Sequence, residues 1–413
     1  MAGDGEVVEV HKWSSLLRVV ASLLLGYALL MVGNALSNTQ TSLALLQQGV
    51  PVTVAGLVQS AYYAGFFIGG FFCSAIVHRY GHHRAFAALA AIICIVVLAQ
   101  ALVHSPLLWA LVRFVNGLAI VGIFMVVESW LNGCVGNAQR GQLFSLYMMV
   151  SYLGASAGQW LLKLPLTQPG WPFIVVAMLF ALAIIPVTLT SQRPLTLVAA
   201  PAGSVVLRTL RTVGELRRLA PLALYGVLIA GCFNSAFYSM LPVVLSQLSY
   251  LPHQIGNFMG LALLAAPLLQ WPMGKWADRS DRCLLLSRTA LTVVVASLLL
   301  TQLLDTVLLL PLALVYVCVA FTFYGTLSGV ANDAMPAERR VETSAALLTL
   351  YALGGTLGPL LCSLAMGALG AAGYFAISTA MAAALLGLAV WTLQQRQGRL
   401  PFIDYLRRIG ARL

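Results

Sequence analysis

The amino-acid sequence predicts an all-α membrane protein with twelve transmembrane helices in two pseudo-symmetric bundles of six. Of its 413 residues, 60% are hydrophobic and only 8% are charged, a balance outside the range of soluble domains. Apolar segments of about 20 residues, the length that crosses a bilayer, recur along almost the whole chain. Unusual residues also recur at a constant offset of 200 positions, which indicates a duplication.

Short polar connections separate the apolar segments. The residues before the first segment are polar and include Asp4, Glu6 and Glu9, so we expect the first span itself to direct membrane insertion, without a cleaved signal peptide. The predicted spans are residues 18–46, 52–76, 84–104, 106–132, 141–164, 170–190, 219–246, 254–276, 284–304, 307–331, 342–368 and 371–394.

The connection between the sixth and seventh spans is the longest and most basic one, and it divides the spans six and six. The predicted domains are an N-terminal bundle at 1–190, a cytoplasmic linker at 191–218, a C-terminal bundle at 219–395 and a basic amphipathic cytoplasmic tail at 396–413.

Basic residues alternate with the predicted topology. The connections after the even-numbered spans and both chain ends hold nearly all of them, whereas the opposite connections hold only Lys163. By the positive-inside rule, both termini face the cytoplasm of an inner-membrane protein. The net charge of +11 is therefore explained by orientation in a lipid bilayer, and no nucleic-acid partner is expected. We expect the protein to be a monomer.

Two G-x-x-x-G pairs are among the residues that repeat at the offset of 200. Small residues at this spacing leave a stripe of helix backbone bare, so we expect spans five and eleven to approach their neighbours closely and one half to slide on the other. The repeated pairs are Gly26 and Gly226, Asn34 and Asn234, Gly56 and Gly256, Arg79 and Arg279, Asn132 and Asn332, Gly154 and Gly354, Gly158 and Gly358, and Gly170 and Gly370.

A charged motif follows span eight, where the sequence reads Gly274-Lys-Trp-Ala-Asp278-Arg279-Ser-Asp281-Arg282. A degraded copy, from Ser74 through His78-Arg79 to Arg84, follows span two. The motif resembles the cytoplasmic G-x-x-x-D-R-x-G-R-R signature of the major facilitator superfamily. Span four holds Arg113-Phe-Val-Asn116-Gly117, which is similar to the superfamily's R-x-x-x-G motif, and the wider run through Glu128 to Asn132 resembles its YcaD-type branch, whose substrate is not settled.

The resemblance implies secondary active transport of a small organic molecule by alternating access, with two bundles that rock about a site near the bilayer midplane. Proton-coupled efflux is the leading expectation. An uncoupled facilitator or importer of a small metabolite, and a non-transporting receptor built on a transporter fold, are the alternatives. The resemblance also implies a cytoplasmic latch, for which the candidates are Arg79, Arg84, Glu128, Asp278, Arg279, Asp281 and Arg282.

Polar side chains on the spans that face the superfamily's central cavity are candidates for the substrate path. On span one, Tyr27, Asn34 and Asn38 share a helix face, and Asn234 with Tyr238 repeats part of that spacing on span seven. Hydrogen bonding between helices is the alternative role. The full candidate set is Asn34, Asn38, Gln59, Tyr63, Arg113, Asn116, Tyr147, Asn234, Tyr238 and Tyr351.

Two ionisable residues, Arg113 and Glu128, interrupt span four, and intramembrane charge is costly and usually functional. Both are candidates for proton coupling. Glu128 is alternatively the acidic partner of Arg79 or Arg84 in the latch, which its predicted depth favours. Arg113 alternatively caps carbonyl groups or packs within the bundle.

Motifs for other chemistries are missing from the sequence. There is no G-x-x-x-x-G-K-[ST] loop for ATP and no His, Cys or Asp cluster with metal-ligand spacing. The sequence therefore predicts neither an enzyme nor a bound cofactor or metal, and the energy for transport is expected to come from an ion gradient, with protons as the candidate ion.

Overall fold

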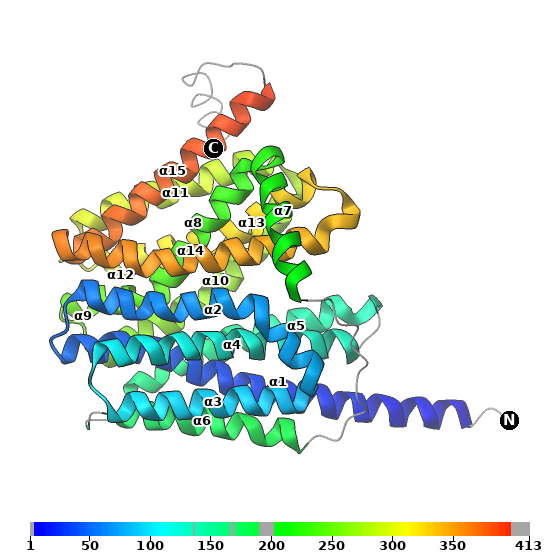
Figure 1. Ribbon diagram of the computed structural model, residues 1–413. Helices are drawn as coiled ribbons and strands as arrows, with labels where there is room; N and C mark the ends of the chain where they lie inside the picture. The colour runs from blue at the N-terminus through cyan, green and yellow to red at the C-terminus, as the bar shows by residue number, and fades with distance from the viewer. Residues whose placement is uncertain (1–3, 135–136, 166–167, 169, 190–201, 398–413) are drawn as a thin grey trace. The chain divides into compact units, whose positions relative to one another are not determined.

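The computed structural model describes residues 4–134, 137–165, 168, 170–189 and 202–397, and all regular structure in these ranges is helical (Figure 1). The predicted tail at 396–413 lies almost wholly outside the described residues. The helices of the first half are α1 (Asp4–Gln47), α2 (Val52–Tyr80), α3 (His82–Leu102), α4 (Pro106–Cys134), α5 (Asn137–Trp160), the short 3-10 helix η1 (Leu161–Lys163) and α6 (Trp171–Thr188).

The second half begins with α7 (Ala202–Leu219), which lies in the predicted linker. The helices that follow are α8 (Pro221–Ser239), α9 (Leu241–Gln247), α10 (Pro252–Arg279), α11 (Arg282–Gln302), α12 (Leu309–Ala320), α13 (Phe323–Ala334), the 3-10 helix η2 (Ala337–Arg339), α14 (Arg340–Leu369) and α15 (Ala371–Gln397). The boundaries of α3 and α11 differ by the predicted offset of 200 at both ends.

Eleven helical segments within the described ranges are long and apolar enough to cross a membrane, compared with the twelve predicted spans. The predicted span at 141–164 corresponds to α5, which has 24 residues but is not among the eleven. Polar and small residues such as Ser145, Ser151 and Ser156 lower its apolar character. Of these residues, Ser151 contacts Tyr27 on α1, as described below.

Two predicted spans are each divided into two helices. The span at 219–246 is broken at Met240, between α8 and α9, just before Pro242. Proline has no backbone N–H to donate and is favoured in the first turn of a helix, so it fits the start of α9 better than the middle of one continuous helix. The span at 307–331 is divided at Phe321 and Thr322, between α12 and α13.

Contacts group the chain into two compact units. The first unit contains residues 1–48, 61–203 and 252–263, and the second contains residues 49–60, 204–251 and 264–413. Within the first unit α1 packs on α5 and α6, and within the second unit α8 packs on α14 and α15. Likewise α3 packs on α4 and α6, and α11 packs on α12 and α15. The two units therefore repeat one internal packing pattern, as a duplication predicts.

The G-x-x-x-G pairs pack helices inside each unit. A Cβ atom on Gly158 would overlap the carbonyl oxygen of Val32 on α1, and one on Gly358 would overlap atoms of Cys232 on α8. The predicted close approach of spans five and eleven to their neighbours is confirmed. The neighbours lie in the same unit, however, so these glycines hold one unit together and do not form the sliding surface that we expected.

Candidate functional site

Arg113 is the centre of a polar network in the first unit. Its side chain projects from α4 and is fully buried. The guanidinium donates a hydrogen bond to Oδ1 of Asn38 on α1, and its Cζ atom lies 4.2 Å from the centroid of the Tyr62 ring on α2. Because a desolvated guanidinium needs hydrogen bonds and a favourable electrostatic surface, Asn38 and Tyr62 stabilise the charge within the span.

Tyr62 extends this network to a second position on α1. Its hydroxyl donates to Oδ1 of Asn34 at 3.1 Å, and its ring meets the Tyr63 ring edge-on at a centroid distance of 5.0 Å. The network therefore joins α1, α2 and α4. Sequence reasoning selected Tyr63 and missed Tyr62, which is the residue that contacts both Asn34 and Arg113. The adjacent pair of tyrosines was the available signal, but it did not indicate which ring faces the arginine.

Gly117 explains how α2 comes so close to Arg113. A Cβ atom at Gly117 would overlap the carbonyl oxygen of Tyr62, and one at Gly65 would overlap that of Phe114. Only residues without a side chain allow these two backbones to touch. The R-x-x-x-G motif thus has a direct physical meaning here, because its glycine lets α2 bring an aromatic ring onto the arginine of the same motif.

Asn116 lies one helical turn from Arg113 and is fully buried. Within the described part of the chain, neither its Nδ2 nor its Oδ1 atom has a hydrogen-bond partner. A buried polar group without a partner costs about 1–3 kcal/mol. This cost makes Asn116 a candidate contact for a ligand or for bound water.

Glu128 belongs to a second cluster, further along α4. The Tyr147 hydroxyl on α5 donates to Oε1 of Glu128 at 3.2 Å, and the Tyr27 ring on α1 stacks on Tyr147 at 4.7 Å between centroids. The Tyr27 hydroxyl is hydrogen-bonded to Oγ of Ser151 at 2.9 Å. Helix α1 therefore contacts both clusters, through Tyr27 at one and through Asn34 and Asn38 at the other.

Two candidate residues of the second unit, Tyr238 and Tyr351, make aromatic contacts. Asn234 is half-buried on α8. The Tyr238 ring packs edge-on against Phe237, and the Tyr351 ring packs edge-on against Tyr324. Gln59 lies on α2 and is fully buried, in the segment that groups with the second unit.

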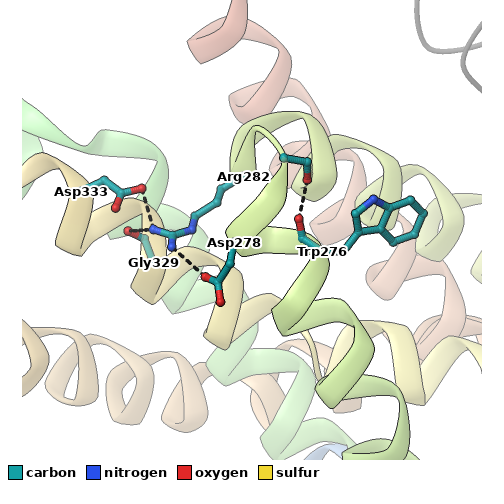
Figure 2. Close-up of polar contacts among 6 residues, drawn as sticks. Trp276, Asp278, Arg282, Gly329 and Asp333 are labelled. Carbon is teal, nitrogen blue, oxygen red and sulfur yellow. Dashed lines mark hydrogen bonds and ion pairs between the residues drawn. The ribbon is translucent and has the colours of Figure 1, made fainter.

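Arg282 is the centre of the charged motif after α10 (Figure 2). Its guanidinium forms ion pairs with Asp278 at 3.1 Å and with Asp333 at 2.6 Å, and it donates to the carbonyl oxygen of Gly329 at 3.0 Å. These contacts join the end of α10, the start of α11 and the end of α13. Oδ1 of Asp281 accepts hydrogen bonds from the backbone N–H groups of Cys283 and Leu284, so it caps the N-terminus of α11.

Sequence reasoning did not include Asp333 in this motif. The signal that could have found it is its position, as an acidic residue at the end of span ten, on the predicted cytoplasmic side where Arg282 begins α11. Arg79, Arg84 and Arg279 are exposed. Among the residues with described side chains, no ion pair joins Glu128 to Arg79 or Arg84, the pairing that we predicted for the latch, and its described hydrogen bond is to Tyr147.

In the ranges that the structure describes, no group of three or more His, Cys, Asp or Glu side chains is close enough together to hold a metal ion.

The sequence model of the Major Facilitator Superfamily matches residues 23–359. The chain belongs to this superfamily. An uncharacterized MFS-type transporter of Yersinia pestis (strain Pestoides F) is 30% identical over 351 residues, covering 84% of this chain and 89% of the relative. The uncharacterized MFS-type transporter YcaD of Salmonella newport (strain SL254) is 28% identical over 355 residues, covering 86% of this chain and 90% of the relative.

Solved structures share the fold. A mutant of the nucleoside transporter NupG has a TM-score of 0.77 at 15% identity, covering 91% of this chain and 99% of that one. A bacterial homologue of the human lysosomal transporter Spinster, inward-facing and unoccupied, has a TM-score of 0.74 at 15% identity, with coverage of 91% and 96%. This superfamily member is thus a multi-pass inner-membrane transporter that works by alternating access, as the YcaD-type resemblance predicted.

Proposed function

We propose that this transporter moves a small organic molecule across the cytoplasmic membrane by proton-coupled efflux. The observation that carries the proposal is the pair formed by buried Arg113 and Asn116, because the Asn116 amide has no hydrogen-bond partner within the described residues. In this proposal, a substrate satisfies that amide. Both termini lie in the cytoplasm, which the distribution of basic residues supports, and the working unit is the monomer.

The substrate site is proposed to recognise a polar acceptor group and an apolar body. Arg113 and Nδ2 of Asn116 donate to the acceptor, and Oδ1 of Asn116 takes a hydrogen bond from the substrate. Two half-buried rings supply an apolar surface nearby, since Phe124 lies between Arg113 and Glu128 along α4 and packs edge-on against Phe66 at 6.0 Å. This combination favours an amphipathic organic molecule.

Glu128 is proposed to carry the coupled proton. Its carboxylate lies within a predicted span and accepts from Tyr147, and no described ion pair joins it to Arg79 or Arg84, so these contacts favour the proton role over the latch. Helix α1 provides the physical link between the two sites, because Tyr27 packs on the partner of Glu128 while Asn38 contacts Arg113. A displacement of α1 on proton transfer would therefore change both sites. Among proteins that share the fold is a D-xylose–proton symporter, with a TM-score of 0.63 at 13% identity and coverage of 91% of this chain and 96% of that one.

Candidate substrates are the compounds that raise the melting temperature of the purified protein, because a bound compound stabilises the protein by mass action. Each such compound is then added to proteoliposomes that contain the protein and a pH-sensitive dye. An imposed pH gradient should drive uphill movement of at least one such compound, accompanied by proton flux. Absence of compound-dependent proton flux for every stabilising compound would refute proton coupling.

Glu128→Gln separates coupled from uncoupled transport. This variant should retain counterflow, in which no net proton movement is needed, and should lose proton-driven accumulation. Asp333→Asn is the matched control, since it removes an acid that contacts Arg282 and not the Glu128 cluster. Equal loss of counterflow and accumulation in Glu128→Gln would support the facilitator or importer alternative, and would assign Glu128 a structural role.

A further inference from the structure

A cavity of about 390 Å³ lies within the first unit, apart from the Arg113 and Glu128 clusters. It is surrounded by the last turns of α1, the end of α3, the start of α4, η1 and the start of α6. Its volume falls within the range of about 300–1,000 Å³ that small-molecule sites occupy. None of the residues named above as contacts of Arg113 or Glu128 lines it, so the cavity is distinct from the proposed transport site.

The cavity wall is rich in side-chain amides and poor in charge. Among the described residues that line it, none is Asp, Glu, Lys or Arg, and His104 is the one imidazole. An amide offers two donors and an acceptor, whereas an ionic ligand would lose its hydration here without a counter-charge in the wall. These amides are the side chains of five glutamines from three separate segments of the chain: Gln40, Gln47, Gln48, Gln100 and Gln168.

Gln100 is a fixed acceptor in this wall. It is only 1% exposed, and its Nε2 atom donates to Oγ1 of Thr41 at 3.0 Å, which holds the amide in one orientation. Its Oε1 atom has no hydrogen-bond partner in the described part of the chain. A buried acceptor without a partner is unfavourable, and a hydrogen bond from a ligand in the cavity would remove this penalty.

We propose that this cavity is a second binding site, for a small neutral polyhydroxylated molecule. One ligand hydroxyl donates to Gln100 Oε1, and others exchange hydrogen bonds with the glutamines near the opening, of which Gln47 and Gln48 are exposed. Trp109 and Phe173 supply apolar wall, against which the C–H groups of such a molecule pack. The site goes beyond the proposed transport function, since none of the residues assigned to substrate or proton takes part in it.

The test uses saturation-transfer difference NMR on the full-length protein in nanodiscs, with myo-inositol and D-glucose as neutral probes and D-gluconate as the charged probe. The neutral probes should give a signal, and gluconate should give none. Gln100→Leu should weaken binding about 10-fold, as expected from loss of one buried hydrogen bond. Gln47→Trp, at an exposed position on the rim, should block the cavity and abolish the signals of the neutral probes. This variant tests the site even if Gln100→Leu does not fold.

Asn116→Ala is the control that separates this site from the transport site. It should abolish stabilisation by transported compounds while leaving the inositol and glucose signals unchanged. The proposal is overturned if neither neutral probe gives a signal, if gluconate binds as well as glucose, or if the signals persist in Gln47→Trp. It is also overturned if Asn116→Ala removes the signals, because the probes would then occupy the transport site.

Discussion

The two units share one packing pattern but differ in the chemistry of their interiors. At an offset of 200 residues, Arg113 corresponds to Ala313 and Asn116 to Tyr316. The first unit thus buries a guanidinium and an amide that has no hydrogen-bond partner among the described residues, where the second has a methyl group and a phenol. The Tyr316 hydroxyl donates to Ser378, and its ring packs edge-on against Phe375, so this position of the second unit is part of an aromatic core.

The charged motif shows the opposite asymmetry. In the second unit Arg282 holds two carboxylates and the carbonyl oxygen of Gly329. The corresponding position of the first unit is His82, which hydrogen-bonds at 2.9 Å to Ser129, the counterpart of Gly329. The same two positions therefore meet in both units. They belong to an ionic network in the second unit and form a histidine–serine hydrogen bond in the first.

Duplication preserved helix packing more strictly than polar chemistry. Packing depends on small residues and matching volumes at many positions, so most changes there are costly. Buried charge is expensive, and one copy suffices for a binding or coupling role. The first unit holds Arg113 and Glu128 within one span, and the second holds the more complete ionic motif.

The largest difference between the units is expected at Arg113 and Ala313. Arg113→Ala should reduce counterflow of a stabilising compound by about 100-fold or more, because a buried charge-assisted contact worth roughly 3 kcal/mol is lost. Ala313→Ser, the matched change in the second unit, should remain near wild type. Equal losses in both variants would show that the asymmetry does not concern transport.

Asn34 and Asn234 provide a smaller contrast at equivalent positions. Asn34→Ala removes the acceptor of the Tyr62 hydroxyl, so counterflow should fall by about 10-fold. Asn234 is half-buried, so Asn234→Ala should lower the counterflow rate by about 3-fold or less. The measurement is the initial rate of counterflow at equal amounts of reconstituted protein. A greater loss for Asn234→Ala than for Asn34→Ala would contradict the larger role in transport that we assign to the first unit.

The ionic motif should contribute modestly to stability. Arg282→Ala removes two ion pairs whose carboxylates are largely exposed, so the free energy of unfolding should fall by about 1 kcal/mol. His82→Ala should have a smaller effect. Chemical denaturation in detergent, monitored by circular dichroism, compares the two variants, and an equal or larger effect of His82→Ala would contradict the contrast.

Rebuilding the ionic motif in the first unit gives the smallest expected effect. His82→Arg alone should not stabilise the protein, because Gly133 stands at the position that Asp333 occupies in the second unit. When His82→Arg is combined with Gly133→Asp, a double-mutant cycle should give a favourable coupling energy of about 0.2–1 kcal/mol in the free energy of unfolding. A coupling energy of zero would show that the two motif positions do not meet in the same geometry in both units.

Helix positions and the duplication could be predicted from the sequence because both are local or periodic properties. A run of apolar residues specifies a helix that can cross a bilayer, and the offset of 200 is visible in residues such as Asn34 and Asn234. Residues of the two polar clusters on α4 could also be selected, among them Asn38 and Arg113 in one and Tyr147 in the other. The division of spans seven and ten into two helices was not predicted, nor was the low apolarity of α5.

Only the tertiary structure decided which side chains meet. The sequence determined that Arg113 and Glu128 lie within one span, and the fold placed Tyr62 over the first and Tyr147 beside the second. It also joined Asp333 to Arg282 and gathered glutamines from three segments around one cavity. The physical reason is that a periodic pattern defines the faces of each helix, whereas partners across helices depend on how closely and at what angle the backbones pack.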